Sequence, residues 1–562
     1  MYGKKTEIFL WLPFLFFLAL LSTALRPIEG FIGHDYYHEF SRLYFGSAFF
    51  WQNGLHIPHY IPSLCGGIPF FADPQNSYFS FPQLLSFFLD PFLASRLTIL
   101  FFYFLGYWGC LYFFKARMKV SLALAHLGGL LFIFNGFSFS HLFVGHLTHH
   151  SYLLIPWFLY FFFSPFPAET GRIQKAAQLS LVPTYMFYSG GMHMLVVLGV
   201  LAILIYPIGR FVLPDRKAKR QQLFFLLTAT GLVLLGCSGK LMLEIAYSRQ
   251  FAVGAIDSSE ENFLVVLLRY FWFIPSWTPL NIVFGRIQFG PWEYIGFISK
   301  LTLPAFAVFL WTALKRKWFS PSLFWGYGGL VTLVALISAG SEFNSLLPFF
   351  RHYHNPIKIL SAFIPLLVGS TVYVLAVAKV RLTSGVFYLT AGVLLIEFSI
   401  SASFFLNHRT GITYPYDAKP YAAFKAERKL PVVTQVVRMQ GADLDAVRGG
   451  ASNLHCYEPL FGYALENLKT EVVEGSTTQM RGGRFNLNHP GCLLYPEHFG
   501  CQAWDRIPMK EIDNFERFTS GIAPRWELPW MPRVVLLFNG LCLIATMLLA
   551  IFPFRIGSPP QS

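Results

Sequence analysis

Residues 359–378 read ILSAFIPLLVGSTVYVLAVA, a run without a charged side chain that is followed directly by Lys379 and Arg381. About 20 apolar residues in a helix cross the hydrocarbon core of a bilayer, so this run has the length of a membrane-spanning helix. Basic residues directly after such a run are typical of its cytoplasmic end, because short cytoplasmic loops retain Lys and Arg. This stretch therefore predicts one helix of a membrane protein.

Similar apolar runs extend over most of the chain. The 562-residue sequence is 54% hydrophobic and only 13% charged, whereas soluble proteins are about 25% charged. This composition excludes a soluble globular enzyme and a disordered chain. We therefore predict an all-α polytopic membrane protein with about twelve transmembrane helices. The other runs are 7–25, 92–114, 122–140, 147–163, 176–190, 191–209, 223–243, 299–314, 322–339, 383–404 and 533–553.

The basic residues indicate how the chain is threaded. The formal net charge is +14, but residues 405–530 hold 14 basic and 14 acidic side chains, so the excess lies between the apolar runs. A cytoplasmic N-terminus places every basic cluster inside, as the positive-inside rule requires. We expect a multi-pass protein of the plasma (inner) membrane with both termini cytoplasmic and no nucleic-acid binding. The first run could be a cleaved signal peptide, but its length favours an uncleaved anchor. The clusters are 4–5, 115–119, 216–220, 315–317 and 379–381.

This threading divides the chain into three parts. Residues 1–404 form a transmembrane domain with a long extracytoplasmic loop at 26–91, in which 36–51 reads as an interfacial amphipathic helix. Residues 405–531 form a small mixed α/β extracytoplasmic module, and 532–562 form the last transmembrane helix and a cytoplasmic tail. Cys492 and Cys501 are nine residues apart in the module and could pair in an oxidising compartment.

Three carboxylates of the first extracytoplasmic loop are candidate catalytic residues. Asp35 follows the first span directly, and Glu39 is four residues later, so both would share one helix face. Asp73 lies near the end of the loop, before Pro74. The alternatives are structural: Asp35 could cap the helix that follows it, and Asp73 could stabilise a turn.

Histidines cluster after the third apolar run. They map to the outer face in this topology, where they could line a substrate cavity or form hydrogen bonds at the membrane interface. A zinc site is a further alternative, but no HExxH or CxxC motif accompanies them. The cluster consists of His141, His146, His149 and His150, with His193 across the next hairpin.

A later outer loop is basic, against the positive-inside tendency. Arg351 and Lys358 bracket His354 at the outer mouth of the span at 359–378. Arg offers a bidentate fork to phosphate and Lys a point charge, so a bound anion would explain them. The alternative is that both side chains extend toward lipid headgroups.

Several stretches together resemble the C-type glycosyltransferase superfamily (GT-C), in particular its YfhO-type bacterial branch. They are GHDYYHEF at 33–40, the Pro- and Gly-rich continuation at 51–85, the hairpin at 145–157, LPFFRHYHNPIK at 347–358 and NHPGCLLYPEHFGC at 488–501. The resemblance covers most of residues 7–404. It implies a catalytic acid at Asp35, a second acidic or polar group at Asp73, and a donor-phosphate site at Arg351 and Lys358.

The resemblance implies an integral-membrane glycosyltransferase, a hexosyl- or pentosyltransferase. It would move a sugar from a polyprenyl-phosphate donor to an extracytoplasmic glycan, lipid or protein acceptor, in contact with membrane lipids. Asp35 stands singly between His34 and Tyr36, without a DxD metal motif at this position. We therefore expect no certain cofactor, and a divalent cation at most. The alternative functions are a transporter or flippase of lipid-linked glycans, and a membrane O-acyltransferase that uses the histidines. Polar groups concentrated at one face, without a visible repeat, favour the transferase over a transporter.

Overall fold

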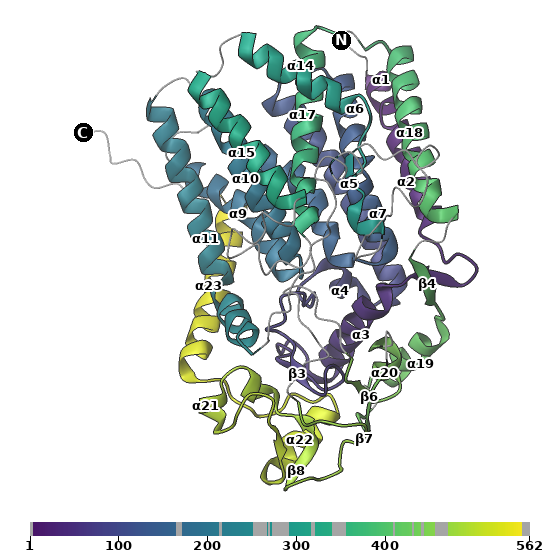
Figure 1. The fold of residues 1–562 in the computed structure, drawn as a ribbon, viewed down its shortest axis with the longest axis vertical. Coiled ribbons are helices and arrows are strands. Elements are labelled where there is room, and N and C mark those ends of the chain that lie inside the picture. Colours follow the sequence, from purple (N-terminus) through teal and green to yellow (C-terminus); the bar gives the residue numbers. More distant parts are fainter. Residues whose placement is uncertain are drawn as a thin grey trace.

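The computed structural model shows a bundle of long helices with a layer of short helices and strands across one end (Figure 1). Helix α1 (Lys4–Phe9) begins at the opposite end of the bundle, and α2 (Leu12–Ala24) continues it toward this layer. The residues described are 4–164, 171–212, 216–250, 267, 270–271, 291–315, 321–339, 356–380, 382–407, 411–429, 432–439, 443–455 and 470–552.

Within these residues, six helical segments are long and apolar enough to cross a membrane. A seventh results if α6 (Leu122–Ile133) and α7 (Gly136–Val144), bent by 44° at the break between them, form one span. The chain is thus a multi-pass membrane protein. The six segments are Glu7–Ala24, Pro91–Arg117 with α5 (Pro91–Tyr112), Lys219–Ser248 within α11 (Arg216–Ser248), Pro356–Val377 with α17 (Phe363–Val377), Ser384–Ser403 within α18 (Ser384–Asn407), and Trp530–Ile551, which is α23.

The other predicted spans form shorter or broken elements. The run 122–140 breaks at Asn135, whose side chain accepts a hydrogen bond from the Ser138 amide and so starts a new helix. The run 147–163 is split into a 3-10 helix, η2 (Leu147–Leu154), and the short α8 (Ile155–Phe162). About twelve full spans are therefore not observed in the described part of the chain. The remaining helices of the bundle are α9 (Arg172–Tyr188), α10 (Met192–Val212), α14 (Thr302–Lys315) and α15 (Pro321–Ala339).

The outer helices carry apolar side chains on exposed faces. In α23, Leu537, Leu541, Ile544 and Leu548 follow helical spacing and are between 51% and 69% exposed. A soluble monomer rarely exposes a contiguous apolar stripe of this size. These faces match a lipid environment.

The layer at the end of the bundle is built from two distant parts of the sequence (Figure 1). Strand β1 (Phe31–Gly33) pairs antiparallel with β4 (Ile412–Pro415), and a bridge joins Leu64 to Asn453. Helix α20 (Asp443–Arg448) packs on α3 (Tyr36–Asn53). The first loop also contains β2 (Tyr60–Ile61), β3 (Ile68–Pro69) and α4 (Phe81–Ser86).

The helix predicted at 36–51 is present as α3, but its environment differs from the prediction. An interfacial helix would face the membrane surface, whereas most of α3 is buried, including the charged Arg42 at 1% exposure. Helix α20 and the helix α19 (Lys419–Glu427) cover it, and the ring of Tyr44 stacks on Phe424 at 3.8 Å. Its aromatic residues therefore pack against protein because the C-terminal module covers this loop.

The module contains two small sheets. Strand β5 (Gln435–Val437) lies between β6 (Ala451–Asn453) and β7 (Gly475–Ser476), and β8 (Arg484–Asn488) pairs with β9 (Arg506–Pro508). Short helices complete it: η9 (Pro490–Leu493), α21 (Pro496–Phe499), η10 (Met509–Glu511) and α22 (Ile512–Thr519).

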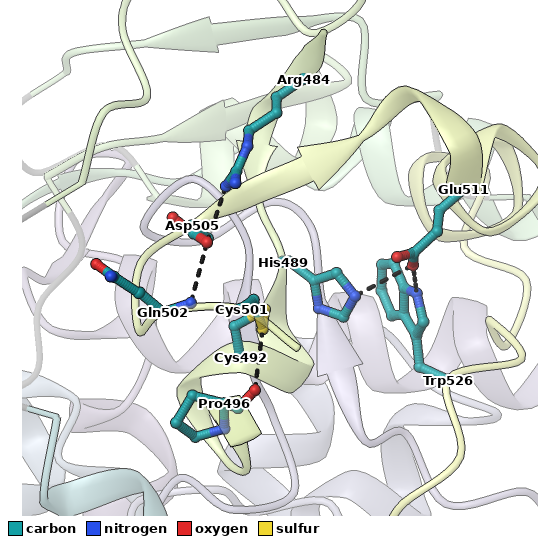
Figure 2. Close-up of a disulfide and its surroundings, with 9 residues drawn as sticks. All are labelled: Arg484, His489, Cys492, Pro496, Cys501, Gln502, Asp505, Glu511 and Trp526. Carbon is teal, nitrogen blue, oxygen red and sulfur yellow. Dashed lines mark hydrogen bonds and ion pairs between the residues drawn. A yellow bond between two sulfur atoms is a disulfide. The ribbon is translucent and has the colours of Figure 1, made fainter. Parts of the chain in front are cut away.

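A disulfide and a buried hydrogen-bond cluster stabilise the end of the module (Figure 2). Cys492 and Cys501 are bonded, with their Cα atoms 5.9 Å apart. Beside them, Glu511 accepts hydrogen bonds from the Trp526 indole at 2.6 Å and from the His489 ring at 3.2 Å. Cys65, in the first loop, is also disulfide-bonded.

Candidate active site

Two glycines bring the end of the first span against the end of α7. Gly145 has φ +112°, and a Cβ there would lie 2.4 Å from the Tyr36 amide nitrogen. A Cβ on Gly33 would lie 2.4 Å from the carbonyl of Val144. The Asp35 amide donates to that same carbonyl at 3.0 Å. Because both backbones can approach this closely only through glycine, Asp35 and His146 become neighbours.

The Asp35 carboxylate contacts two imidazoles. Oδ2 lies 2.5 Å from Nε2 of His146, and Oδ1 lies 3.2 Å from Nε2 of His34. The side chain makes no capping hydrogen bond to α3, so capping is not what holds it. Burial raises the pKa of Asp35, but the imidazoles of His146 and His34 outweigh it and hold this pKa below its usual value of 3.8. The side chain is 15% exposed, so its carboxylate is ionised and accessible to a small group.

A second carboxylate lies on the other side of His146. Glu293 belongs to the short 3-10 helix η4 (Pro291–Tyr294), which is fixed to α7 by hydrogen bonds from Ser140 to the carbonyl groups of Trp292 and Ile295. Its Oε1 is 3.6 Å from Nε2 of His146. Asp35 and Glu293 thus flank one imidazole, although they are more than 250 positions apart in the sequence.

Lys358 completes this group of charges. It lies in η6 (Pro356–Ala362), at the start of the span that ends in α17, and its Nζ is 3.1 Å from Oε2 of Glu293. The lysine is buried, at 6% exposure. Its ammonium therefore extends toward Glu293 inside the protein, and not toward lipid headgroups. We call Asp35, His146, Glu293 and Lys358 the Asp35 cluster.

Two more of the predicted histidines adjoin the Asp35 cluster. The rings of His141, His146 and His149 lie with centroids 4.7–5.2 Å apart. His193 lies next to His149, with ring centroids 6.2 Å apart. His150 differs, because its Nδ1 contacts the Leu147 carbonyl and its Nε2 the Tyr185 hydroxyl. The role predicted for His150 in a substrate cavity stays a prediction.

Glu39 is buried one helical turn after Asp35. Burial raises the pKa of Glu39 to about 7, and the nearby charge of Arg42 opposes this shift only in part. One of its oxygens, Oε2, is buried without a hydrogen-bond partner. Its catalytic role stays a prediction.

Asp73 lies in a separate network. Its Oδ2 accepts hydrogen bonds from Nε and Nη2 of Arg42 at 3.2 and 3.0 Å, and its Oδ1 accepts from the Gln75 amide at 2.7 Å. Asp73 thus stabilises a turn, as the structural alternative predicted, and also pairs with Arg42. Its catalytic assignment stays a prediction.

The network continues into the C-terminal module. Arg42 also contacts His38, and Nδ1 of His38 lies 2.9 Å from Oδ2 of Asp443. The other oxygen of Asp443 accepts a hydrogen bond from the Asn453 side chain at 2.6 Å. We call Asp73, Arg42, His38, Asp443 and Asn453 the Arg42 network; it joins α3 to the rest of the first loop and to the C-terminal module.

Two predicted residues, Arg351 and His354, lie outside the described residues. Sequence reasoning missed Glu293 and Arg42. The available signal for each was a lone charge in an aromatic, apolar context: PWEYIGF at 291–297 and FSRLYF at 40–45. A charge that is costly to bury in such a context is usually paired.

The chain was compared with known proteins. No protein-family model matches it, and no curated protein matches its sequence. Among solved structures it is similar to arabinofuranosyltransferase AftD from Mycobacteria, at 14% identity and a TM-score of 0.44 over 78% of this chain and 30% of that chain. It is also similar to ArnT from Cupriavidus metallidurans, solved with undecaprenyl phosphate bound, at 13% identity and a TM-score of 0.43 over 80% of this chain and 85% of that chain.

This chain spans less than a third of the length of the AftD chain. The YfhO-type branch stays a prediction from the sequence.

Proposed function

We propose that the chain is an integral-membrane glycosyltransferase that uses a polyprenyl-phosphate sugar donor and an extracytoplasmic acceptor. One observation carries this proposal. Asp35, shortly after the first span, is a partly exposed carboxylate that is oriented by His146, and a buried lysine lies in the same cluster. This combination supports a base for the acceptor next to a cation for the leaving phosphate.

The proposed reaction uses this cluster as follows. The acceptor hydroxyl attacks the anomeric carbon of the donor sugar, and its proton passes to Asp35. The bond between that carbon and the phosphate oxygen breaks, and polyprenyl phosphate leaves with the bonding electrons. His146 holds the carboxylate in place through its 2.5 Å contact. An ionised base that is already oriented needs no rearrangement when the charge develops.

Lys358 supports the donor half of the proposal. Its ammonium is paired with Glu293 and lies at the outer start of a span, where a lipid-linked phosphate would meet the protein. We propose that Lys358 binds the donor phosphate and that Arg351 and His354, from the preceding loop, contribute to the same site. Transfer of a pentose or hexose to a glycan, lipid or protein belongs to this proposal.

A second candidate uses the same pair of residues. A carboxylate that orients an imidazole is also the arrangement of acyl-transfer catalysts, and the contact between Asp35 and His146 has this form. A membrane O-acyltransferase is therefore the alternative, with His146 as the base.

The test is transfer by the purified full chain. Wild type, Asp35→Asn and the control Asp417→Asn are offered polyprenyl-phosphate pentoses and hexoses and, separately, acyl thioesters. Asp417 is an exposed aspartate whose side chain accepts a hydrogen bond from the Lys419 amide, which Asn can also do. We expect sugar transfer by the wild type and the control, and about 10²–10⁴-fold slower transfer by Asp35→Asn.

Asp35→Asn should keep the folded yield of the wild type, because the side chain makes no capping bond. If Asp35→Asn transfers sugar at nearly the wild-type rate, Asp35 is not the base. Acyl transfer without sugar transfer would replace the proposal by its alternative. Comparison of the cell-surface glycans of cells that contain the protein with those of cells that lack it identifies the acceptor.

A further inference from the structure

Three imidazoles converge in the bundle close to its extracytoplasmic end. Each of His141, His146 and His149 offers a ring nitrogen, and these nitrogens lie within 4.8 Å of one another. The turn at Gly145 produces this arrangement, because it reverses the chain between His141 at the end of α7 and the start of η2. We call these residues the three-histidine site.

Five of the six ring nitrogens of this site have no hydrogen-bond partner in the described part of the chain, and the exception is Nε2 of His146, which contacts Asp35. Both ring nitrogens of His141 and of His149, and Nδ1 of His146, are buried without a hydrogen-bond partner. His141 and His149 are 0% and 3% exposed. Buried polar atoms are normally hydrogen-bonded, so several unsatisfied nitrogens facing one small volume point to a ligand that accepts their lone pairs. A metal cation is such a ligand.

The surroundings of His146 match those of a metal ligand. A metal-bound histidine usually presents its other ring nitrogen to a carboxylate, which fixes the tautomer and raises the basicity of the ring. Nε2 of His146 faces Asp35 at 2.5 Å, while its Nδ1 is buried and unsatisfied. Glu293 adds a second carboxylate, with Oε2 3.9 Å from Nε2 of His141. The nearest cation, Lys358, is paired with that same carboxylate.

We propose that His141, His146 and His149 bind a divalent transition-metal ion, zinc in the first place. Imidazole nitrogens suit zinc, copper, nickel and iron better than magnesium or calcium, which prefer oxygen ligands. Three histidines with one position left open are a common zinc arrangement, and Glu293 is placed to fill or to face the fourth position. Short sequence motifs for zinc, such as HExxH, do not detect this site, because the spacing of its three histidines results from a turn and not from a single helix.

This inference goes beyond the transferase proposal and does not depend on it. Two alternatives make different predictions: the imidazoles could bind substrate hydroxyl groups only, or pack without a ligand. In both cases the purified protein would take up no zinc through these residues.

The test measures metal on the full-length protein. The chain is purified in detergent with an affinity tag free of histidine, treated with a chelator, and dialysed against zinc or cobalt chloride. Elemental analysis then gives the bound metal per chain for the wild type, His141→Ala, His149→Ala and His150→Gln. His150 is the matched control: it is equally buried and adjacent to His149, but its nitrogens have protein partners.

We expect about one zinc per chain for the wild type and for His150→Gln, and at least a tenfold lower affinity for His141→Ala and His149→Ala. In the wild type, bound cobalt should give the visible absorption of a low-coordinate site. Zinc should raise the melting temperature of the wild type, whereas magnesium should not. Equal zinc content in the wild type and both alanine variants would overturn the proposal.

If the alanine variants do not fold, the zinc content and the cobalt spectrum of the wild type alone test the proposal. No uptake of zinc and no cobalt spectrum would then overturn the proposal. Neither measurement involves sugar transfer, so this failure can be told apart from failure of the transferase proposal.

Discussion

The Asp35 cluster lies at the start of α3 and the Arg42 network includes His38 and Arg42 of that helix. Each group combines carboxylates, an imidazole and a basic side chain, yet the two differ in how the polar atoms in and next to them are satisfied. In the Arg42 network, carboxylates, imidazole and guanidinium contact one another in a continuous chain from Asp73 to Asn453. Next to the Asp35 cluster, the nitrogens of His141 and His149 are buried without a hydrogen bond. The side chains of the Arg42 network thus satisfy one another, whereas the two imidazoles would be satisfied by the ligand proposed above.

This difference separates structural from functional charges. A buried ion pair whose partners are all present contributes specificity, and loss of one partner is destabilising. Unsatisfied buried groups reduce stability, so they persist where they serve binding or catalysis. The Arg42 network therefore joins the first loop to the module, and the unsatisfied imidazoles favour the proposed chemical role for the region around Asp35.

The largest effect should come from breaking the Arg42 network. Arg42→Met leaves the Asp73 carboxylate buried without its cation, which should lower the free energy of unfolding by about 3–5 kcal/mol. The measurement is the melting temperature and the denaturant midpoint of the purified full chain. Arg525→Met, which removes an exposed charge of the same layer, is the control and should change stability little.

The double variant Arg42→Met/Asp73→Asn sharpens this prediction. It removes both charges, so it should be more stable than Arg42→Met alone. A double variant as unstable as the single one would mean that Arg42 stabilises the fold through packing and not through its charge.

Glu39 lies between the two groups, because its ionisation is coupled to Asp35 and His146 on one side and to Arg42 and Asp73 on the other. A folded pKa of about 7, against 4.5 for the free side chain, means that the folded state disfavours the charged form. Stability should therefore fall as the pH rises from about 4.5 through 7. Glu39→Gln should remove this loss and gain up to about 3 kcal/mol above pH 7, with no gain below pH 4.5.

The measurement is the melting temperature of wild type and Glu39→Gln against pH, with Glu427→Gln as an exposed control. A constant difference between wild type and Glu39→Gln at all pH values would contradict the assigned pKa. A loss of transfer activity in Glu39→Gln at full stability would assign Glu39 to the Asp35 cluster.

The smallest effect concerns Lys358. Lys358→Met removes a charged hydrogen-bond partner of the proposed donor phosphate, which is worth about 1.5–3 kcal/mol, or roughly 10–100-fold in KM for the donor. The rate at saturating donor should change less, because this contact is already made in the ground state. Lys358→Arg keeps the charge and should recover part of the affinity. An unchanged KM in Lys358→Met would place the phosphate elsewhere.

The sequence allowed a multi-pass helical membrane protein to be predicted, because apolar length is a local signal. The orientation deduced from the basic clusters stays a prediction. The sequence also indicated Asp35 and the histidines, which stand out as polar groups next to spans. It did not indicate Glu293 as the partner of His146, because this contact depends on how η4 packs on α7.

The prediction of about twelve spans is not confirmed, since the described residues contain six or seven segments long and apolar enough. Hydropathy counts apolar residues without regard to where a helix ends, so the run 122–140 reads as one helix. The capping bond at Asn135 breaks it. Similarly, the aromatic residues of α3 are equally compatible with lipid and with protein, and only the position of the C-terminal module decides between them.

The pairing of β1 with β4 has a consequence for how the protein is made. Gly33 finds its partner Ile412 only after nearly 380 more residues have been added, which takes roughly 20–80 s at 5–20 residues per second. During this time α3 is uncovered, and Arg42 and Asp73 are present before Asp443 exists. The nascent chain must therefore keep an aromatic surface from aggregating until the C-terminal module covers it. A chain that stops before residue 412 would remain in this open, exposed form and would be a substrate for quality control.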